Sequence, residues 1–185
     1  EIELLAAEGL RHQFAPLGVD SYSHRFNFEG FLVYRPGPQC HGYTQVFRNG
    51  VLEAVKVDVV VQNLDMFLLP GGKFSAQLME SFPRYMEALR KLDVPTPLVF
   101  IASLEGVRDV QLATRRGMID EDVEPFLQDE LQFSPAIIEE YGNSAHYRKA
   151  MRPVFDTLWN AGGYARCEYF NSAGEWEAPS YVWPR

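Results

Sequence analysis

The chain has 185 residues and a net charge of −8, with 46% hydrophobic and 23% charged residues. A chain of this length buries about 70% of its unfolded surface in one core, which excludes a disordered polypeptide and a scaffold held by disulfides. We therefore expect a single domain over residues 1–185.

The first half of the chain predicts a meander of β-strands. Residues 26–34, FNFEGFLVY, alternate and then become apolar, which is typical of a strand with Gly30 at a bulge or a close approach. Residues 35–42 are rich in proline and glycine and predict a loop. Two further strands follow, YTQVF over 43–47 and VLEAVKVDVVV over 51–61.

Three residues, Arg48, Asn49 and Gly50, separate those two strands. Asn-Gly is the strongest short hairpin signal, and a type I′ turn needs positive φ at both central residues. We expect Arg48 to end a strand and Asn49-Gly50 to form a type I′ turn. The alternative is a polar tip that contacts a ligand, but turn chemistry already explains the motif.

A long helix is expected next. LPGGKF, residues 69–74, is not a phosphate loop, because Phe74 follows Lys73 where a serine or threonine is needed. We predict instead a loop that leads into a helix. Apolar residues at helical spacing indicate this helix over about 74–92, and Pro83 should kink it or split it in two.

The rest of the chain predicts a strand pair and a last helix. The strands lie near 97–103 and 107–113, around a turn at 105–106. The last helix has Ser144 as its cap and ends at the glycine pair 162–163. A meander, a helix, a strand pair and further helices together predict an α+β fold, with a mainly antiparallel sheet packed with two or more helices.

The sequence contains no catalytic or metal-binding motif. Cys40 and His41 are the one conceivable thiolate–imidazole pair, and neighbours in sequence rarely face each other. His146 and Cys167 could join them around a metal ion, but nothing in the spacing demands it. We expect no cofactor and no metal, and the sequence leans away from an enzyme.

Negative charge is concentrated late in the chain. Residues 1–117 hold 12 Lys/Arg against 13 Asp/Glu, and residues 118–185 hold 5 against 12. Asp120, Asp122 and Glu124 match neither a calcium loop nor a defined catalytic pair, so we interpret them as a solvated face. A phosphate polymer would be repelled, so this chain is not expected to bind nucleic acid by itself.

The C-terminal aromatic residues form a possible partner surface. Trp176, Tyr181 and Trp183 lie beyond a turn at 172–174, in a stretch without clear periodicity. Interface cores favour tryptophan and tyrosine, so these residues are expected to dock onto a parent domain or a partner.

Four segments, taken in order, resemble one bacterial family: HRFNFEGFLVY (24–34), YTQVFRNGVLEAV (43–55), FPRYMEALRKLDVPTPLVFIASLEGV (82–107) and RPVFDTLWNAGGYARCEYFNSAGEW (152–176). Members of that family begin with a Schlafen AlbA-type domain, often labelled helix-turn-helix or ATP-binding. The resemblance covers nearly all 185 residues, but only as the region C-terminal to that domain.

The resemblance implies that the full-length relatives are nucleic-acid-binding or regulatory proteins, some linked to defence. Their work on nucleic acid or nucleotides would belong to the N-terminal domain, so no functional residue is carried over. The start at Glu1 rather than methionine agrees with a C-terminal part of a longer protein.

We therefore expect a noncatalytic C-terminal module that serves oligomerisation, regulation or partner recognition. One alternative is a domain that extends the nucleic-acid-contacting surface of the Schlafen-type domain. The other is a metal-dependent hydrolase or nuclease, whose carboxylates would have to converge in space.

The expected partners are the protein's own N-terminal domain, another protein or a second copy of the chain. Nucleic acid would be contacted only through the N-terminal domain. No run approaches the roughly 18 apolar residues that span a membrane, and no signal-like segment is present, so we expect a cytoplasmic protein without membrane contact.

Overall fold

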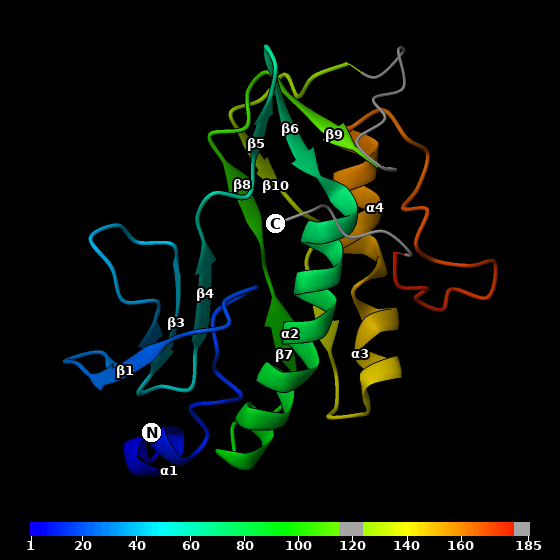
Figure 1. Cartoon of the computed structure of the whole chain (residues 1–185). Coiled ribbons are helices and arrows are strands. Elements are labelled where there is room, and N and C mark those ends of the chain that lie inside the picture. The colour runs from blue at the N-terminus through cyan, green and yellow to red at the C-terminus, as the bar shows by residue number, and fades with distance from the viewer. Residues whose placement is uncertain (115–123, 180–185) are drawn as a thin grey trace. The chain divides into compact units, whose positions relative to one another are not determined.

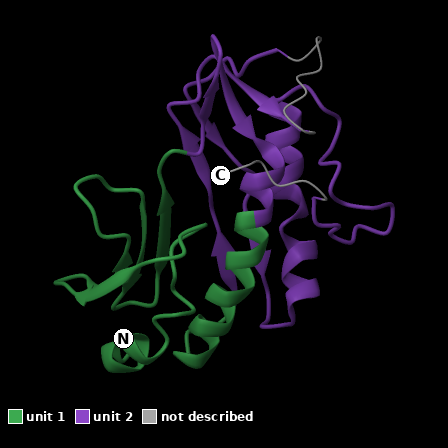
Figure 2. Cartoon of the chain, viewed as in Figure 1, with its two compact units in different colours: residues 1–58, 77–96 green, residues 59–76, 97–185 purple. Residues whose placement is uncertain are grey.

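The structure, a computed structural model, describes residues 1–114 and 124–179 and has an α+β fold (Figure 1). The chain divides into two compact units (Figure 2). Unit 1 holds residues 1–58 and 77–96, and unit 2 holds residues 59–76 and 97–185. The expectation of a single domain stays a prediction.

Unit 1 is built on one four-stranded antiparallel sheet, which we call sheet A, with strand order β1-β2-β3-β4. A short helix precedes the sheet, and the elements are α1 (Leu4–Gly9), β1 (Ser23–Phe26), β2 (Gly30–Tyr34), β3 (Gly42–Phe47) and β4 (Leu52–Lys56). Consecutive strands pair throughout, so the predicted meander is confirmed.

One face of sheet A forms the core of unit 1, and we call it the inner face. Phe31, Val33 and Thr44 are fully buried there. The Tyr85 hydroxyl, from the long helix α2 (Gly71–Lys91), lies 3.2 Å from Thr44 Oγ1 and donates a 2.8 Å hydrogen bond to the Ala15 carbonyl. Because side chains alternate along a strand, the neighbours of these residues must face the other way.

The predicted strand over 26–34 is wrong in its extent. Phe26 ends β1, and the chain turns back through a tight loop before β2 begins at Gly30. Asn27 Oδ1 accepts a 2.8 Å hydrogen bond from the Gly30 amide, which closes this turn. The close approach expected at Gly30 is confirmed, since a Cβ there would overlap the Val46 carbonyl oxygen.

The hairpin between β3 and β4 is confirmed, but its type I′ turn is wrong. Only Gly50 has a positive φ, of 88°, and its amide bonds the Phe47 carbonyl at 2.9 Å. That pattern is typical of a three-residue loop with glycine in the left-handed position. Arg48 lies in the turn rather than at the end of the strand, and Val51 N donates to Asn49 Oδ1 at 3.1 Å.

Unit 2 contains three small sheets. The first has the order β5-β6-β9, with β6 and β9 parallel, and the other two are the antiparallel pairs β7–β11 and β8–β10. The strands are β5 (Val61–Asn63), β6 (Met66–Pro70), β7 (Leu98–Phe100), β8 (Ser103–Glu105), β9 (Val110–Ala113), β10 (Glu130–Gln132) and β11 (Ala136–Ile138). The expected pairing of the strands near 97–103 and 107–113 is therefore wrong.

Helix α2 follows β6 without the predicted loop and is continuous through Pro83, so a split there is wrong. Residues up to Ala76 belong to unit 2 and the remainder to unit 1 (Figure 2). Phe82 and Met86 are buried on either side of the proline. We infer that this packing offsets the backbone hydrogen bond that proline cannot donate.

The predicted last helix is two helices, α3 (Ser144–Ala150) and α4 (Arg152–Ala161), with Pro153 in the first turn of α4. Its cap is Asn143 rather than Ser144, because Asn143 Oδ1 accepts a 2.9 Å hydrogen bond from the His146 amide. The apolar residues of these helices and their junction are buried core, and they comprise Tyr147, Met151, Phe155, Leu158 and Trp159.

Over residues 1–114 and 124–179, no helix is long and apolar enough to cross a bilayer.

Replacing Gly50 with valine should lower the free energy of unfolding by about 1–2 kcal/mol, because β-branched residues resist positive φ. A Cβ at this position would also lie 3.2 Å from Val94 Cγ2. Denaturant unfolding measures the effect. The control is Gly9→Val, where no atom lies within 4 Å of the added Cβ. Equal stability of the two variants would contradict the positive-φ turn.

Candidate functional site

An open groove of about 430 Å³ lies in unit 1, on the outer face of sheet A. Side chains of β2, β3 and β4 line it, together with the loop over residues 35–40. The three strands are hydrogen-bonded to one another edge to edge, and their opposite face forms the core of unit 1. Ligand sites of this size are typically lined by apolar and aromatic side chains with a few fixed polar groups.

Aromatic residues form much of this groove. Tyr34 of β2 and Tyr43 of β3 stand directly opposite each other in the register, and Phe47 lies further along β3. All three are half-buried, so part of each side chain remains accessible. Arg25 of β1 makes a cation–π contact with Tyr34, since its guanidinium carbon lies 5.5 Å from the Tyr34 ring centroid.

The polar groups of the groove are held in place. Gln45, only 5% exposed, accepts a 2.7 Å hydrogen bond from Asn27 Nδ2 and donates to the Val46 carbonyl at 3.1 Å. The Tyr43 hydroxyl donates to Glu53 Oε2 at 3.0 Å. Burial and this bond raise the pKa of Tyr43 above its ordinary value. Tyr43 is therefore a neutral donor at physiological pH, and not a phenolate base.

Cys40 and His41, the one conceivable thiolate–imidazole pair, make no hydrogen bond to each other. Cys40 is exposed and lines the groove, while His41 Nδ1 lies 3.3 Å from Asp58 Oδ2 instead. His146 and Cys167 belong to unit 2, so the four residues considered for a metal are divided between the units. Within residues 1–114 and 124–179, no three His, Cys, Asp or Glu side chains are grouped to hold a metal ion.

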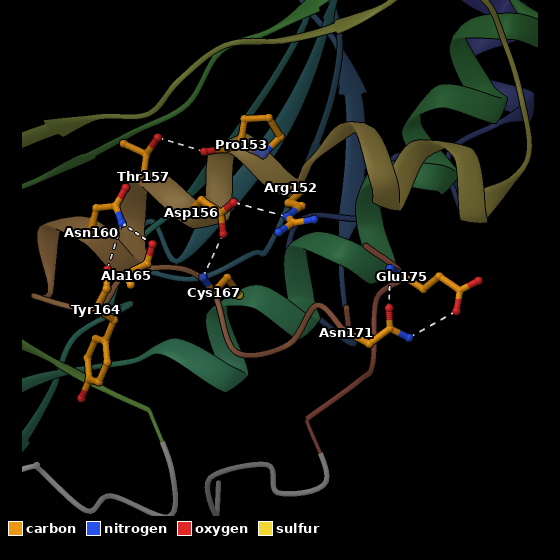
Figure 3. Close-up of polar contacts among 10 residues, drawn as sticks. All are labelled: Arg152, Pro153, Asp156, Thr157, Asn160, Tyr164, Ala165, Cys167, Asn171 and Glu175. Atoms are coloured by element: carbon orange, nitrogen blue, oxygen red, sulfur yellow. Dashed lines mark hydrogen bonds and ion pairs between the residues drawn. The ribbon is translucent and has the colours of Figure 1, made fainter. Parts of the chain in front are cut away.

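Cys167 lies beside an ion pair between Arg152 and Asp156 (Figure 3). Its amide donates a 2.9 Å hydrogen bond to Asp156 Oδ1, and Arg152 Nε lies 3.4 Å from Asp156 Oδ2. The thiol is fully buried, and burial raises its pKa to about 12. A thiol that stays protonated at neutral pH is a poor nucleophile, so this cluster fixes the chain after α4 rather than performing chemistry.

The turn before Trp176 is confirmed. Asn171 Oδ1 accepts a 2.9 Å hydrogen bond from the Glu175 amide (Figure 3). It also accepts one from the Ala173 amide at 3.0 Å, and Gly174 has a φ of 77°. Trp176 is half-buried, with its ring centroid 5.4 Å from that of Phe170. It also contacts Phe155 and Tyr169, at 5.7 and 5.8 Å between ring centroids.

The role of the C-terminal aromatic residues as a partner surface stays a prediction. Trp176 belongs to an aromatic cluster inside unit 2, while Tyr181 and Trp183 lie outside the described residues. Of the acidic stretch, Glu124 is described and exposed, whereas Asp120 and Asp122 also lie outside the described residues.

Sequence reasoning missed the groove because it looked for a partner surface only among the C-terminal aromatic residues. A usable signal was present in the alternation of β2. Once Phe31 and Val33 face the core, Leu32 and Tyr34 must face outward, and Tyr43 and Phe47 follow through the register. The position of the 35–40 loop beside these residues had no such signal.

The two thiols should react very differently. In the native chain a maleimide should modify Cys40 and spare Cys167, which is fully buried with a pKa raised to about 12. Because the thiolate is the reactive form, the raised pKa should also keep Cys167 unlabelled between pH 7 and pH 9. Mass spectrometry counts the adducts, and unfolding in denaturant should expose the second site. Rapid labelling of a folded Cys40→Ser variant would contradict this assignment.

Comparison of the chain with family models, with curated proteins and with solved structures found no match.

Proposed function

We propose that this chain is a noncatalytic recognition module, and that the groove on sheet A binds a segment of a partner protein. The observation that carries the proposal is the groove itself, with Tyr34, Tyr43 and Phe47 half-buried beside fixed polar groups. Tyrosine and phenylalanine are enriched at the centres of protein interfaces, because they bury a large area at little cost in side-chain entropy.

The chemistry of the groove supports binding rather than catalysis. Its phenol, Tyr43, has a raised pKa and donates to Glu53, and its thiol, Cys40, makes no hydrogen bond within the described chain. A nucleophile needs an adjacent base, but the neighbouring His41 contacts Asp58. The groove can therefore position a partner without activating a bond.

The family resemblance suggests the kind of protein to which this module would belong. We propose that the module regulates a bacterial Schlafen AlbA-type protein, or assembles it with a partner, in the cytoplasm. The partner segment would come from the N-terminal domain, from another protein or from a second copy of the chain. Two free cysteines, one of them exposed, suit a reducing compartment.

A second candidate is contact with single-stranded nucleic acid. Tyr34 and Tyr43 lie side by side on a sheet face, with Arg25 over the first ring and Arg35 lining the groove. Bases stack on such rings, and arginine neutralises phosphates. We rank this candidate second because Glu29 and Glu53 line the same groove, and the whole chain carries −8.

Selection of random heptapeptides against the whole chain tests the recognition role. Peptides recovered with the native chain should bind a Phe47→Ser variant about tenfold more weakly, because an aromatic anchor in the groove is lost. Fluorescence titration of the synthetic peptides measures the dissociation constants.

The matched control is Phe28→Ser, since Phe28 is 90% exposed and does not line the groove. Its affinities should equal those of the native chain, and thermal unfolding should show that both variants fold. Recovered peptides that bind Phe47→Ser as tightly as the native chain would contradict a role for the groove.

A further inference from the structure

We propose that the groove recognises an arginine side chain of the partner segment, seated against Glu53 between the rings of Tyr43 and Phe47. This inference rests on the recognition role proposed above and specifies the chemistry of the occupant. It follows from the register of sheet A, from the charges that line the groove and from the contact between Arg25 and the Tyr34 ring on the same face.

The register places Glu53 between two aromatic neighbours. Glu53 of β4 pairs with Gln45 of β3, and Tyr43 and Phe47 lie two residues before and after Gln45 on the same face. Diagonal neighbours on one face are close enough for aromatic and long side chains to touch. The Tyr43–Glu53 hydrogen bond of 3.0 Å confirms this proximity on one side.

The carboxylate of Glu53 lacks an ionic partner. No Lys, Arg or His nitrogen lies within 4.0 Å of Glu53 or Glu29 in the described part of the chain. While the groove is open, water solvates these charges. A segment that covers the rings would remove that water, and a buried carboxylate is costly unless it gains a cation. An occupant that brings a cation to Glu53 would therefore bind more tightly than a neutral one.

Arginine fits this seat better than other cations. A guanidinium can bond a carboxylate through two N–H groups while its flat face stacks on an aromatic ring. Sheet A already accommodates this geometry, because the Arg25 guanidinium carbon lies 5.5 Å from the Tyr34 ring centroid. Within the described chain no cation lies over Tyr43 or Phe47, so those two rings remain for an incoming side chain.

The remaining charges set the orientation of the partner. Arg35 lines the same groove and has no carboxylate within 4.0 Å among the described residues. A partner arginine should therefore lie at the β4 side of the groove, away from Arg35. Unit 1 itself holds 8 Lys/Arg against 10 Asp/Glu, so its net charge of −2 also favours a cationic segment over a phosphate polymer.

Protection of Cys40 provides a direct measurement, because this exposed thiol lines the groove. Four heptapeptide mixtures share flanking positions drawn from Val, Thr, Tyr and Ser and differ only in a fixed central arginine, citrulline, lysine or glutamate. The arginine mixture should slow maleimide labelling of Cys40 at about tenfold lower concentration than the citrulline mixture. Citrulline keeps the shape and removes the charge.

Two variants test whether Glu53 is the group that distinguishes arginine from citrulline in the peptide. In Glu53→Gln, the tenfold difference between arginine and citrulline should shrink to about twofold or less. Glu105→Gln is the control, because it removes the same charge from an exposed residue of unit 2, and the difference should persist. The citrulline comparison changes only the peptide, so it also holds if a variant is unstable.

The outcomes separate the two proposals. Equal protection by the arginine and citrulline mixtures overturns the arginine seat, while groove-dependent binders from the heptapeptide selection would keep the recognition role. Protection of Cys40 by a 15-nucleotide single strand of thymidine at about 150 mM salt, weakening steeply as salt rises, overturns both and favours nucleic acid. Stronger protection by the glutamate mixture would assign the seat to Arg35 and overturn the inference.

Discussion

The hydroxyl of Tyr85 links helix α2 to the buried face of sheet A. It lies 3.2 Å from Thr44 Oγ1 on β3 and donates to the Ala15 carbonyl at 2.8 Å, so it joins α2, the sheet and the segment after α1. Burial raises the pKa of this hydroxyl, which keeps it a neutral donor. A buried polar group must be satisfied, so this contact helps to hold α2 against the inner face.

The open face differs from the core face in composition. The inner face carries Phe31, Val33 and Val46, all fully buried, whereas the outer face carries tyrosines, Gln45 and Glu53. The side-chain amide of Gln45 is buried, and its hydrogen bonds to Asn27 and to the Val46 carbonyl hold it in place at the base of the groove. Glu53, in contrast, is exposed to solvent and accepts one hydrogen bond, from Tyr43. The recognition proposal follows from this contrast between a buried, fully bonded amide and an exposed carboxylate that has no ionic partner among the described residues.

Much of the fold could be predicted from local sequence. Alternation along β2 and β3 gave the meander, and Asn49-Gly50 located its hairpin. The turn type was missed because it depends on the sign of φ at Asn49, and asparagine can adopt either sign. Continuity of α2 through Pro83 was missed because burial on both sides of the proline outweighs a local rule.

Pairings between distant segments could not be predicted. β7 pairs with β11 and β8 with β10, and each of these strands has only three residues. Such short strands carry too little periodicity to specify a partner, so tertiary packing selects it. The groove could be predicted only in part. Its tyrosines were implied by alternation, whereas its wall depends on how the loop over 35–40 folds.

The central claim is that recognition occurs on the outer face of sheet A and not at the C-terminal aromatic residues. NMR of tyrosine and tryptophan rings tests it most directly, with the tightest heptapeptide from the selection added stepwise to the whole chain. The account predicts shifts at Tyr34 and Tyr43, with the Trp176 indole unchanged. Shifts confined to Trp176, with both tyrosine rings unchanged, would contradict it.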